Sequence, residues 1–499
     1  MTGNPAIVQK YLNELHRAKS ITDVQRLWVL TFPNVDGFSP LQQALIKGSS
    51  ENLKLYLGEL AKYRGPNGLL SDQKYEQILT DGNQAGFSPL HQVLKANDHE
   101  NMRVFVAEVE ANVSPAILKK LLLDLNAASF SPLHDALKAK CPRNCQVYLD
   151  LVMKSVREGF ISSEEFKLLL IRPNEAGITP FQQALINGDP ESAEMYLKCL
   201  NNARVDGAVS PEEYSTLLLF HDCGGFSPLH DAVISVNPKL LGFYLSELIQ
   251  FQKQGLIGSL ELKYLVLNRN DAGFTVLLQA IKTGVREVLD ILMSFVLKLR
   301  QDPLTNFSDT EYKELLLHSN NAGFTPLLQA FTTGGTAVLE TYFNYLDDAV
   351  RQKFLTKQEY KGALLNPNKA GFSCLHQLLR NHGTVAELRM YVGRIENLVQ
   401  EGQATTDELK TLLLSSNKFG FSTLHQAANS GKFHLVQALL NVFKRYCKVG
   451  DYGRLVSSMN LSSVKPNGEH RKIIQLLYQE KRDVNQKQSR NHLVIRSIR

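Results

Sequence analysis

Five histidines recur at one position of a repeated phrase, and two of them are followed directly by aspartate. The pairs His134–Asp135 and His230–Asp231 place an imidazole beside a carboxylate, an arrangement that metal sites and general bases use. In other copies of the phrase the same position holds glutamine or leucine, which cannot do that chemistry. We therefore interpret it as a position that caps and packs a helix. Its occupants are Gln42, His91, His134, Gln182, His230, Leu278, Leu328, His376 and His425.

Cysteine offers a second kind of chemistry. Cys141 and Cys145 have a spacing that would let both thiols face one ligand, but no second Cys or His pair stands nearby to complete a tetrahedral site. The sequence contains no phosphate-binding GxxxxGK(S/T) loop, no GxSxG nucleophile elbow and no HExxH helix. We therefore expect no catalytic residue, no metal and no cofactor, and we expect the cysteines to be reduced.

The repeated phrase accounts for most of the chain. NQAGFSPLHQVL at 83–94 returns as NAGFTPLLQAF at 321–331, and nine copies follow one another at intervals of 43 to 50 residues. Each copy has Asn or Asp three residues before a glycine, or before a serine in the third copy, a combination typical of a tight turn. These anchor residues are Gly37, Gly86, Ser129, Gly177, Gly225, Gly273, Gly323, Gly371 and Gly420.

Each turn leads into a helix start. Two residues after the anchor stands Ser or Thr in all nine copies, and Pro usually follows. A hydroxyl there caps free backbone N–H groups, and Pro fits the first helical position. The phrase Asx-x-x-Gly-x-Ser/Thr-Pro-Leu-His resembles the ankyrin-repeat signature over residues 34–440. The resemblance implies a turn followed by a short first helix and a longer second helix.

An ankyrin repeat of about 33 residues leaves roughly fifteen residues of each copy unexplained. Fifteen residues before each anchor stands Ser, Thr or, once, Gly258, and Glu or Gln follows three residues later in seven copies. Leu-rich runs such as EEFKLLL then lead into the next turn. These features predict a third helix in every repeat. We therefore expect an all-α, right-handed-stacking α-solenoid of about nine ankyrin-like repeats, whose neighbours complete one another's apolar core.

The ends of the array differ from its repeats. We predict N-terminal capping helices over 1–33, nine repeats over 34–440, a degenerate C-terminal capping repeat over 441–484 and a flexible basic tail over 485–499. The net charge of +6 arises from residues 465–499, which carry nine Lys or Arg against three Asp or Glu. A neutral body argues against a repeat surface that binds nucleic acid.

The N-terminal residues and the lengths of the apolar stretches indicate where in the cell the protein is located. MTGNPAIVQKYLNELH has charged residues where a signal peptide would need an apolar core, and no apolar stretch is long enough to cross a membrane. We expect a cytoplasmic monomer without a membrane span, whose partner is another protein and not a nucleic acid.

A polar residue follows the capping position in every repeat. In a stacked array these side chains should form a file along the first helices, which could be an inter-repeat hydrogen-bond ladder, a partner-binding stripe on the concave face, or both. This Gln/Asp file consists of Gln43, Gln92, Asp135, Gln183, Asp231, Gln279, Gln329, Gln377 and Gln426.

The turn tips are the second candidate surface, because the ankyrin resemblance implies that partners contact the tips and the exposed side of the first helix. Most tips are small and bland, such as Ala127–Ala128. Lys418 and Phe419 in the ninth turn stand out, since an exposed aromatic can anchor a partner.

Together these features indicate a non-enzymatic scaffold that presents an extended surface to another protein. Ankyrin-like arrays are frequent among bacterial effectors that type IV secretion systems inject into host cells, and the basic tail resembles some translocation signals. The resemblance implies delivery into a host cytoplasm without a cleavable signal peptide, and binding of a host protein. The alternatives are an enzyme with a groove-assembled site, for which Asp135 and Asp231 are the first suspects, and a tail that binds nucleic acid or an acidic membrane.

Overall fold

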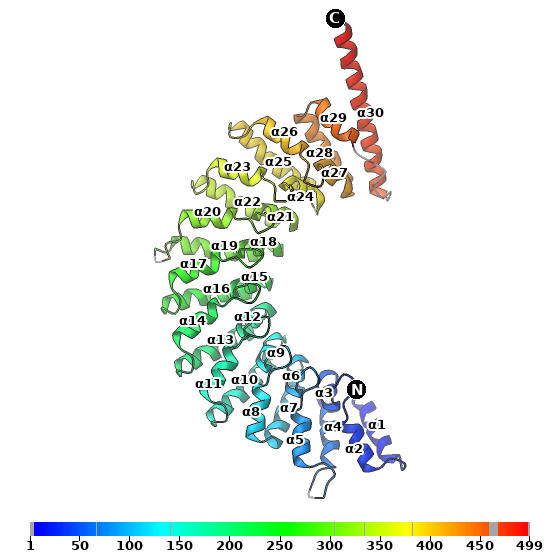
Figure 1. Ribbon diagram of the computed structural model, residues 1–499, viewed down its shortest axis with the longest axis vertical. Helices are drawn as coiled ribbons and strands as arrows, with labels where there is room; N and C mark the ends of the chain where they lie inside the picture. Colours follow the sequence, from blue (N-terminus) through cyan, green and yellow to red (C-terminus); the bar gives the residue numbers. More distant parts are fainter. Residues whose placement is uncertain are drawn as a thin grey trace. The chain divides into compact units, whose positions relative to one another are not determined.

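The protein forms an all-α solenoid of stacked three-helix repeats, with its C-terminal helix laid along the last of them (Figure 1). The computed structural model describes residues 4–65, 67–139, 141–303, 305–333, 335–381, 383–458 and 468–497, without the side chains of 452, 457, 458, 468 and 488–497. The chain divides into two compact units, Met1–Glu261 and Leu262–Arg499, and the boundary falls inside helix α17. Each unit is described by itself below.

Every repeat contributes a short first helix, a longer second helix and a third helix. The first helices are α3 (Pro40–Lys47), α6 (Pro89–Lys95), α9 (Pro132–Lys138), α12 (Pro180–Asn187), α15 (Pro228–Ile234), α18 (Val276–Thr283), α21 (Pro326–Thr333), α24 (Cys374–Arg380) and α27 (Thr423–Asn429). The second helices are α4 (Ser50–Ala61), α7 (His99–Asn112), α10 (Pro142–Arg157), α13 (Pro190–Val205), α16 (Pro238–Lys253), α19 (Arg286–Gln301), α22 (Thr336–Arg351), α25 (Val385–Gln400) and α28 (Phe433–Tyr446).

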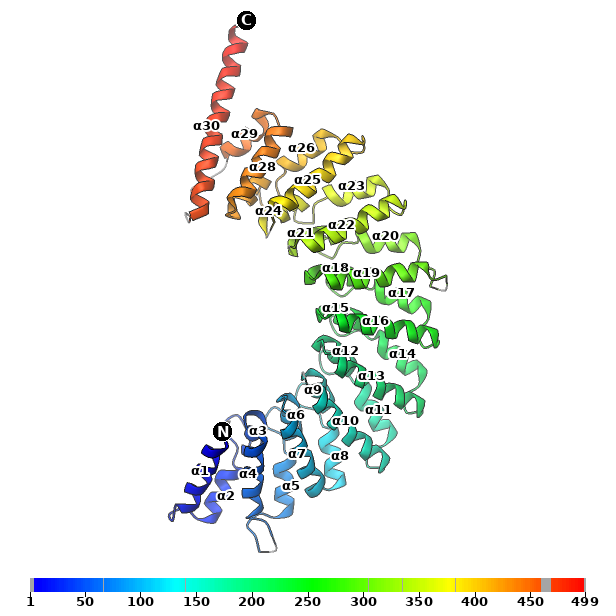
Figure 2. The ribbon, with the colours of Figure 1, turned by 180° about the vertical axis from the view of Figure 1, so that it is seen from behind.

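The third helices lead into the nine turns and confirm the predicted extra element. They are α2 (Asp23–Thr31), α5 (Asp72–Thr80), α8 (Pro115–Leu123), α11 (Ser163–Ile171), α14 (Pro211–Leu219), α17 (Ser259–Leu267), α20 (Asp309–Leu317), α23 (Lys357–Leu365) and α26 (Thr406–Leu414). Within each unit the first helices line one side of the stack and the third helices line the opposite side (Figures 1 and 2). We call these the first-helix side and the third-helix side.

Local hydrogen bonds explain why the third helices begin where they do. Complete capping boxes start α2, α11, α14, α20, α23 and α26. Helix α8 lacks the acidic partner because Ile117 stands in its place, and Glu76 of the preceding repeat accepts hydrogen bonds from the Ser114 backbone N–H and hydroxyl, each at 2.7 Å. A carboxylate at this end also favours the helix dipole.

The turns are built by their Asn side chains. Asn83 Oδ1 accepts hydrogen bonds from the N–H groups of Ala85 and Phe87, at 3.1 and 3.0 Å. Gly86 then adopts φ +76°, and Ser129 takes the same left-handed conformation, φ +59°, in the third turn. Successive turns are also joined by backbone hydrogen bonds, such as Ala127 N–H to Ala85 O at 3.0 Å in the first unit and Lys418 N–H to Ala370 O at 3.1 Å in the second.

Buried tyrosines tie six of the nine second helices, α4, α10, α13, α16, α22 and α25, to the preceding third helix. Tyr196 Oη donates to Leu170 O at 2.7 Å, and Tyr391 Oη donates to Leu364 O at 2.6 Å. Their rings lie in the apolar core between repeats, which also holds the leucines of all three helices. The repeats therefore share one core within each unit, as a stacked array requires.

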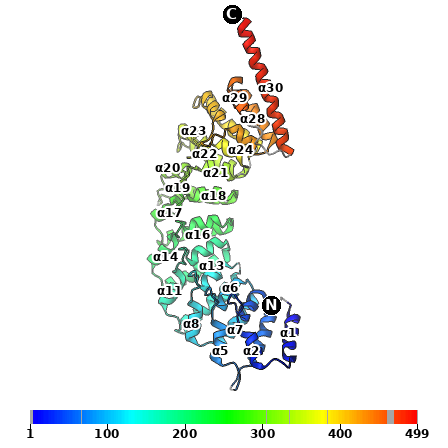
Figure 3. The same cartoon turned by 45° about the vertical axis from the view of Figure 1, so that its right-hand side comes forward.

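Additional helices lie at both ends of the chain. At the N-terminal end α1 (Pro5–Arg17) packs against α4. At the C-terminal end α29 (Val449–Ser458) and α30 (Gly468–Ser497) follow the ninth repeat, and α30 lies against α28 and α29 (Figure 3). The segment predicted as a flexible tail, 485–499, is helical as far as Ser497, and its flexibility stays a prediction. The predicted boundaries of the caps also stay predictions, and residues 459–467 and 498–499 lie outside the described chain.

Candidate interaction surfaces

Two of the recurring histidines, His91 and His134, are structural caps that also join neighbouring repeats. His134 Nδ1 lies 2.8 Å from Ser131 Oγ, and the Ser131 backbone N–H donates to the same nitrogen at 3.3 Å. On the other side of the ring, Nε2 lies 3.1 Å from the Ile178 carbonyl oxygen of the next repeat. A carbonyl only accepts hydrogen bonds, so Nε2 must carry the proton and Nδ1 accepts. This arrangement confirms the predicted capping role.

Where glutamine replaces histidine, its side chain makes the same hydrogen bond to the next repeat. Gln42 Nε2 donates to Phe87 O at 2.7 Å, and Gln182 Nε2 donates to Phe226 O at 3.0 Å. Together with His91, whose Nε2 lies 3.3 Å from Phe130 O, these residues form a chain of inter-repeat contacts in the first unit. We call Gln42, His91, His134 and Gln182 the His/Gln ladder.

Burial keeps these imidazoles neutral. It lowers the pKa of His91, His134 and His376 to about 4, because water cannot solvate the charged ring. Each of the three side chains is almost fully buried. A neutral ring that is fully engaged in its cap has no free nitrogen for a metal or a substrate, so His134 and its neighbour Asp135 do not form the metal pair that their sequence suggests.

The Gln/Asp file is brought together along the first-helix side, but it is mostly buried. Gln43 is partly exposed, whereas Gln92, Asp135, Gln183, Asp231, Gln279, Gln329, Gln377 and Gln426 are all buried. Asp231 Oδ2 accepts from Gln182 Nε2 of the preceding repeat at 3.1 Å, while Gln329 Nε2 donates to Thr333 Oγ1 within its own helix at 3.1 Å. Neither the ladder role nor the partner-binding role of the whole file is decided by these contacts, and both stay predictions.

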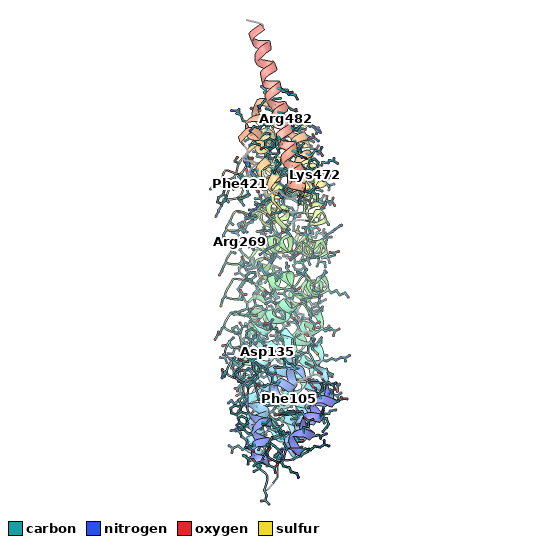
Figure 4. All side chains as sticks on the ribbon, turned by 90° about the vertical axis from the view of Figure 1, so that its right-hand side faces the viewer. Phe105, Asp135, Arg269, Phe421, Lys472 and Arg482 are labelled. Carbon is teal, nitrogen blue, oxygen red and sulfur yellow. The ribbon has the colours of Figure 1, made fainter. Side chains whose placement is uncertain are left out.

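The two aspartates of the file sit in apolar surroundings. Burial raises the pKa of Asp135 to about 6 and that of Asp231 to about 8, so Asp231 is largely protonated at neutral pH. Both residues are 2% exposed (Figure 4 labels Asp135 in the first unit), which leaves almost no surface for a substrate to touch. The raised pKa values therefore reflect burial within the stack.

Two phenylalanines and a lysine mark the ninth turn. Phe419 is 69% exposed and Phe421 is 43% exposed, and Lys418 beside them is exposed too. The glycine anchors of earlier turns contact the following turn, as Gly371 does with Lys418, whereas Gly420 faces open space. Figure 4 shows Phe421 at the edge of the second unit, on the same edge as Arg269, which precedes the sixth turn. The predicted candidates Lys418 and Phe419 are therefore accessible.

A second ladder, of ion pairs, runs along the third-helix side and was not anticipated. A lysine ten residues before an anchor reaches the capping acid of the next third helix, or Asp451 of α29 after the ninth repeat. The pairs are Lys119–Glu165 (2.6 Å), Lys167–Glu213 (3.1 Å), Lys263–Glu311 (3.1 Å), Lys313–Glu359 (2.9 Å), Lys361–Glu408 (2.9 Å) and Lys410–Asp451 (2.8 Å). We call them the Lys/Glu ladder. The recurrence of lysine at this position is visible in the sequence and could have revealed it.

The thiols and the metal-binding side chains are dispersed. Cys141 and Cys145 are free and buried, as is Cys199. Burial raises the pKa of Cys145 to about 12 and that of Cys199 to about 11, so neither is a thiolate at neutral pH. Among the described residues no three His, Cys, Asp or Glu side chains come close enough together to hold a metal ion. Nor does any described helix combine the length and the apolar character needed to cross a membrane.

The sequence matches no family model and no curated protein. Two solved structures are similar in fold. One is the ankyrin repeat domain of Bcl-3, a member of the IkappaB protein family, with 17% identity and a TM-score of 0.33 over 62% of this chain and 99% of that one. The other comes from the complex of the Bd0816 predatory endopeptidase of Bdellovibrio bacteriovorus with the immunity protein Bd3460, with 16% identity and a TM-score of 0.32 over 54% of this chain and 99% of that one.

The repeat itself identifies the fold. An Asx turn, a hydroxyl-capped first helix and a longer second helix recur in register, and the capping side chain bonds to the following repeat. A third helix with its own cap is added to each of them. In the construction of its repeats, this chain has an ankyrin-like fold that is extended by a third helix in each repeat.

Proposed function

We propose that this protein is a non-enzymatic scaffold that binds another protein, and that the ninth turn supplies a main contact. The observation that carries this proposal is the exposure of Phe419 and Phe421 where the series of turns ends. Large exposed aromatics beside a cation are the usual anchors of protein interfaces, because they bury much apolar area for little loss of side-chain entropy.

The ninth turn is also held in place before a partner arrives. Asn417 Oδ1 accepts hydrogen bonds from the N–H groups of Phe419 and Phe421, at 2.9 and 3.0 Å. The Phe419 ring lies 6.2 Å from the ring of Phe372 in the eighth turn, which limits its motion. A preorganised anchor loses less entropy on binding. The Gln/Asp file is a second proposed contact, and its partly exposed member Gln43 is the residue that a partner could touch.

The test compares a ninth-turn variant with a matched variant elsewhere. The double variant Lys418→Ala/Phe419→Ala removes the anchor, and Gln84→Ala changes the exposed tip of the second turn as a control. Proteins captured from a lysate by the wild type and by Gln84→Ala, but not by the double variant, are purified and their binding is measured by calorimetry. We expect the double variant to weaken that binding at least about tenfold, or about 1.4 kcal/mol. If the captured partner bound the wild type, Gln84→Ala and the double variant with equal affinity, the ninth turn would be refuted as the contact.

We further propose, from the resemblance stated above, that the protein acts as a cytoplasmic monomer and as an effector delivered to a host cell through its basic tail. Deletion of 485–499 tests the role of the tail. The buried residues of α30, Ile473, Leu477 and Val484, precede the deletion, so the C-terminal end should stay folded. We expect translocation of a reporter fusion to be lost while partner binding in vitro is retained. Translocation that persists without the tail would contradict this role.

A further inference from the structure

The N-terminal end of the stack contains two of the three helices of a repeat. Helix α2 leads into the first turn as every third helix does, and α1 packs against α4 as one second helix packs against the next. By this equivalence α1 and α2 correspond to the second and third helices of a repeat. No first helix precedes α1 among the described residues, which begin at Asn4.

Inside the stack, a first helix covers the aromatic ring of the second helix that follows it. Phe181 of α12 lies 5.8 Å from the ring of Tyr196 in its own repeat and 5.6 Å from the ring of Tyr244 in the next. In the second unit Phe331 of α21 lies 5.2 Å from Tyr391 of the next repeat. The first helix of one repeat thus completes the core around the tyrosine of its successor.

At the N-terminal end the equivalent place is a groove. Tyr56 of α4 occupies the position of Tyr244, and its hydroxyl makes the same bond, to Leu30 O at 2.8 Å. Next to its ring lies a groove of about 300 Å³, lined almost entirely by apolar side chains. The lining residues are Ile7, Val8, Tyr11, Leu12, Val29, Leu30, Pro40 and Tyr56.

Exposed apolar side chains on the same two helices extend this surface. Ile7 and Tyr11 of α1 are 51% and 52% exposed, and Trp28 and Phe32 of α2 are 56% and 55% exposed. The rings of Trp28 and Phe32 stack with their centroids 4.4 Å apart. Exposed apolar side chains on the helices that line a groove favour a site of interaction.

The C-terminal end shows which element closes an open end of this stack. There α30 lies across α28 and α29 and buries Ile473, Leu477 and Val484 on one helical face (Figure 3). An amphipathic helix is therefore the kind of cover that the repeats accept. The N-terminal groove likewise has apolar walls, which are formed by residues of α1, α2, α3 and α4.

We propose that the N-terminal groove is a docking site for a short amphipathic helix of a partner protein, which takes the place of a preceding first helix. The helix would direct an aromatic or a large aliphatic side chain into the groove, against the exposed side chains of Ile7 and Tyr11 of α1 and Val29 of α2. This is a helix-in-groove interaction. It extends the stacking interface already present between repeats and is separate from the ninth turn.

The test uses the chain's own first helix as the probe. A peptide of residues 178–187 (ITPFQQALIN), held helical by a covalent link between positions 183 and 187, is titrated into the full-length protein. A second peptide with Phe181→Ala is the negative probe. Peptide anisotropy reports binding, and the fluorescence of Trp28, the only tryptophan of the chain, reports contact at the N-terminal end.

Protein variants then locate the contact. Tyr11→Ala and Ile7→Glu change exposed residues of the groove, and Tyr478→Ala changes a tyrosine on α30 that is similarly exposed, at 53%. Circular dichroism and melting temperature establish that each variant is folded. We expect saturable binding that is at least about tenfold weaker in Tyr11→Ala and Ile7→Glu, and unchanged in Tyr478→Ala. Phe419→Ala should also leave peptide binding unchanged, which separates this proposal from that on the ninth turn.

Two outcomes would overturn the proposal. One is the absence of saturable binding, or binding that the groove variants and the Phe181→Ala peptide do not weaken. The other is a concentration-dependent dimer that Ile7→Glu dissociates and Tyr478→Ala does not, since the groove would then be covered by a second copy of this chain.

Discussion

The first-helix side and the third-helix side of each unit join neighbouring repeats by different physical means. On the first-helix side, neutral His and Gln side chains are buried and bond to backbone carbonyls, as His134 does to Ile178. On the third-helix side, charged side chains pair near the surface, as Lys313 does with Glu359 at 2.9 Å. The two contacts have similar spacings along the chain, 44 and 46 residues, but lie in surroundings of different polarity.

This difference teaches that burial decides whether neighbouring repeats are joined by neutral hydrogen bonds or by ion pairs. A charge on the first-helix side would lose its hydration without a partner, so the groups there are uncharged or are made so by a shifted pKa. On the third-helix side water solvates the charges, so the ion pairs cost little and contribute little. The stack should therefore depend strongly on its buried ladder and weakly on its exposed one.

Acid should affect the buried capping histidines most. His91, His134 and His376 have a pKa of about 4 in the folded protein and 6.5 as model groups, so the unfolded chain binds more protons between these values. Stability is then fully present above pH 6.5 and falls as the pH drops toward 4, by about 3 kcal/mol for each histidine. Urea unfolding at pH 7, 6, 5 and 4 measures the loss.

A triple variant isolates this effect. Glutamine occupies the same position at Gln42 and Gln182, so His91→Gln/His134→Gln/His376→Gln should keep the caps and flatten the pH dependence. The exposed His434→Gln serves as the control. An equally steep loss in the triple variant would show that other groups cause the acid sensitivity.

Removal of a single side chain of the His/Gln ladder should lower the free energy of unfolding nearly as much as the protonation of one histidine does. His134→Ala leaves the Ile178 carbonyl and the Ser131 N–H without their partner and opens a cavity in the stack. We expect a loss of about 2–3 kcal/mol in the free energy of unfolding, measured with urea at pH 7. His134→Gln should recover most of it, and a loss below about 0.5 kcal/mol would refute the structural role of the ladder.

Asp231 should give the opposite pH dependence on the same side. Its pKa is 3.8 as a model group and about 8 in the folded protein, so the folded state binds more protons between these values. Stability is greatest at low pH and falls by about 1.4 kcal/mol per pH unit as the pH rises toward 8. Asp231→Asn keeps an acceptor for Gln182 and should be more stable than the wild type at pH 8, measured by melting temperature. If Asp231→Asn and the wild type had equal melting temperatures at pH 7 and at pH 8, Asp231 would not be buried as described.

The exposed ladder should show the smallest effect. Lys313 and Glu359 retain 36% and 33% side-chain exposure, so Lys313→Met should cost less than about 1 kcal/mol at low salt. The difference from the wild type should shrink further in 1 M NaCl, where the Debye length is only about 3 Å. Urea unfolding at both salt concentrations checks this. A loss as large as that of His134→Ala would erase the distinction between the two sides.

The local features of the repeats could be predicted from the sequence because their partners lie within three or four residues. Asn83 shapes its own turn, Ser131 caps its own helix, and Glu165 closes its own capping box. The fold class follows from repetition of these features. The inter-repeat hydrogen bonds of the first unit run through the His/Gln ladder, one residue before the Gln/Asp file, because the third residue of the first helix reaches both its cap and the next turn. The role predicted for the Gln/Asp file stays a prediction.

The contacts between repeats were harder to predict because they join residues more than forty positions apart. Lys361 and Glu408 are 47 residues apart in the chain, and Glu76 caps a helix 38 residues away where Ile117 breaks the usual pattern. No local rule pairs such residues. The sequence predicted Phe419 as a candidate anchor. Its exposed fraction of 69% depends on which side chains pack against the ninth turn, and only the tertiary structure shows these.

The sequence by itself determined the turns, the caps, the number of repeats and their three helices, since each depends on bonds between near neighbours. Only the tertiary structure decided which polar side chains are buried and neutral, which are exposed and charged, and where the stack is left open. Those properties depend on how much water reaches a group once the repeats have stacked. For this reason the groove beside Tyr56 could be recognised only by comparison with the filled place beside Tyr244.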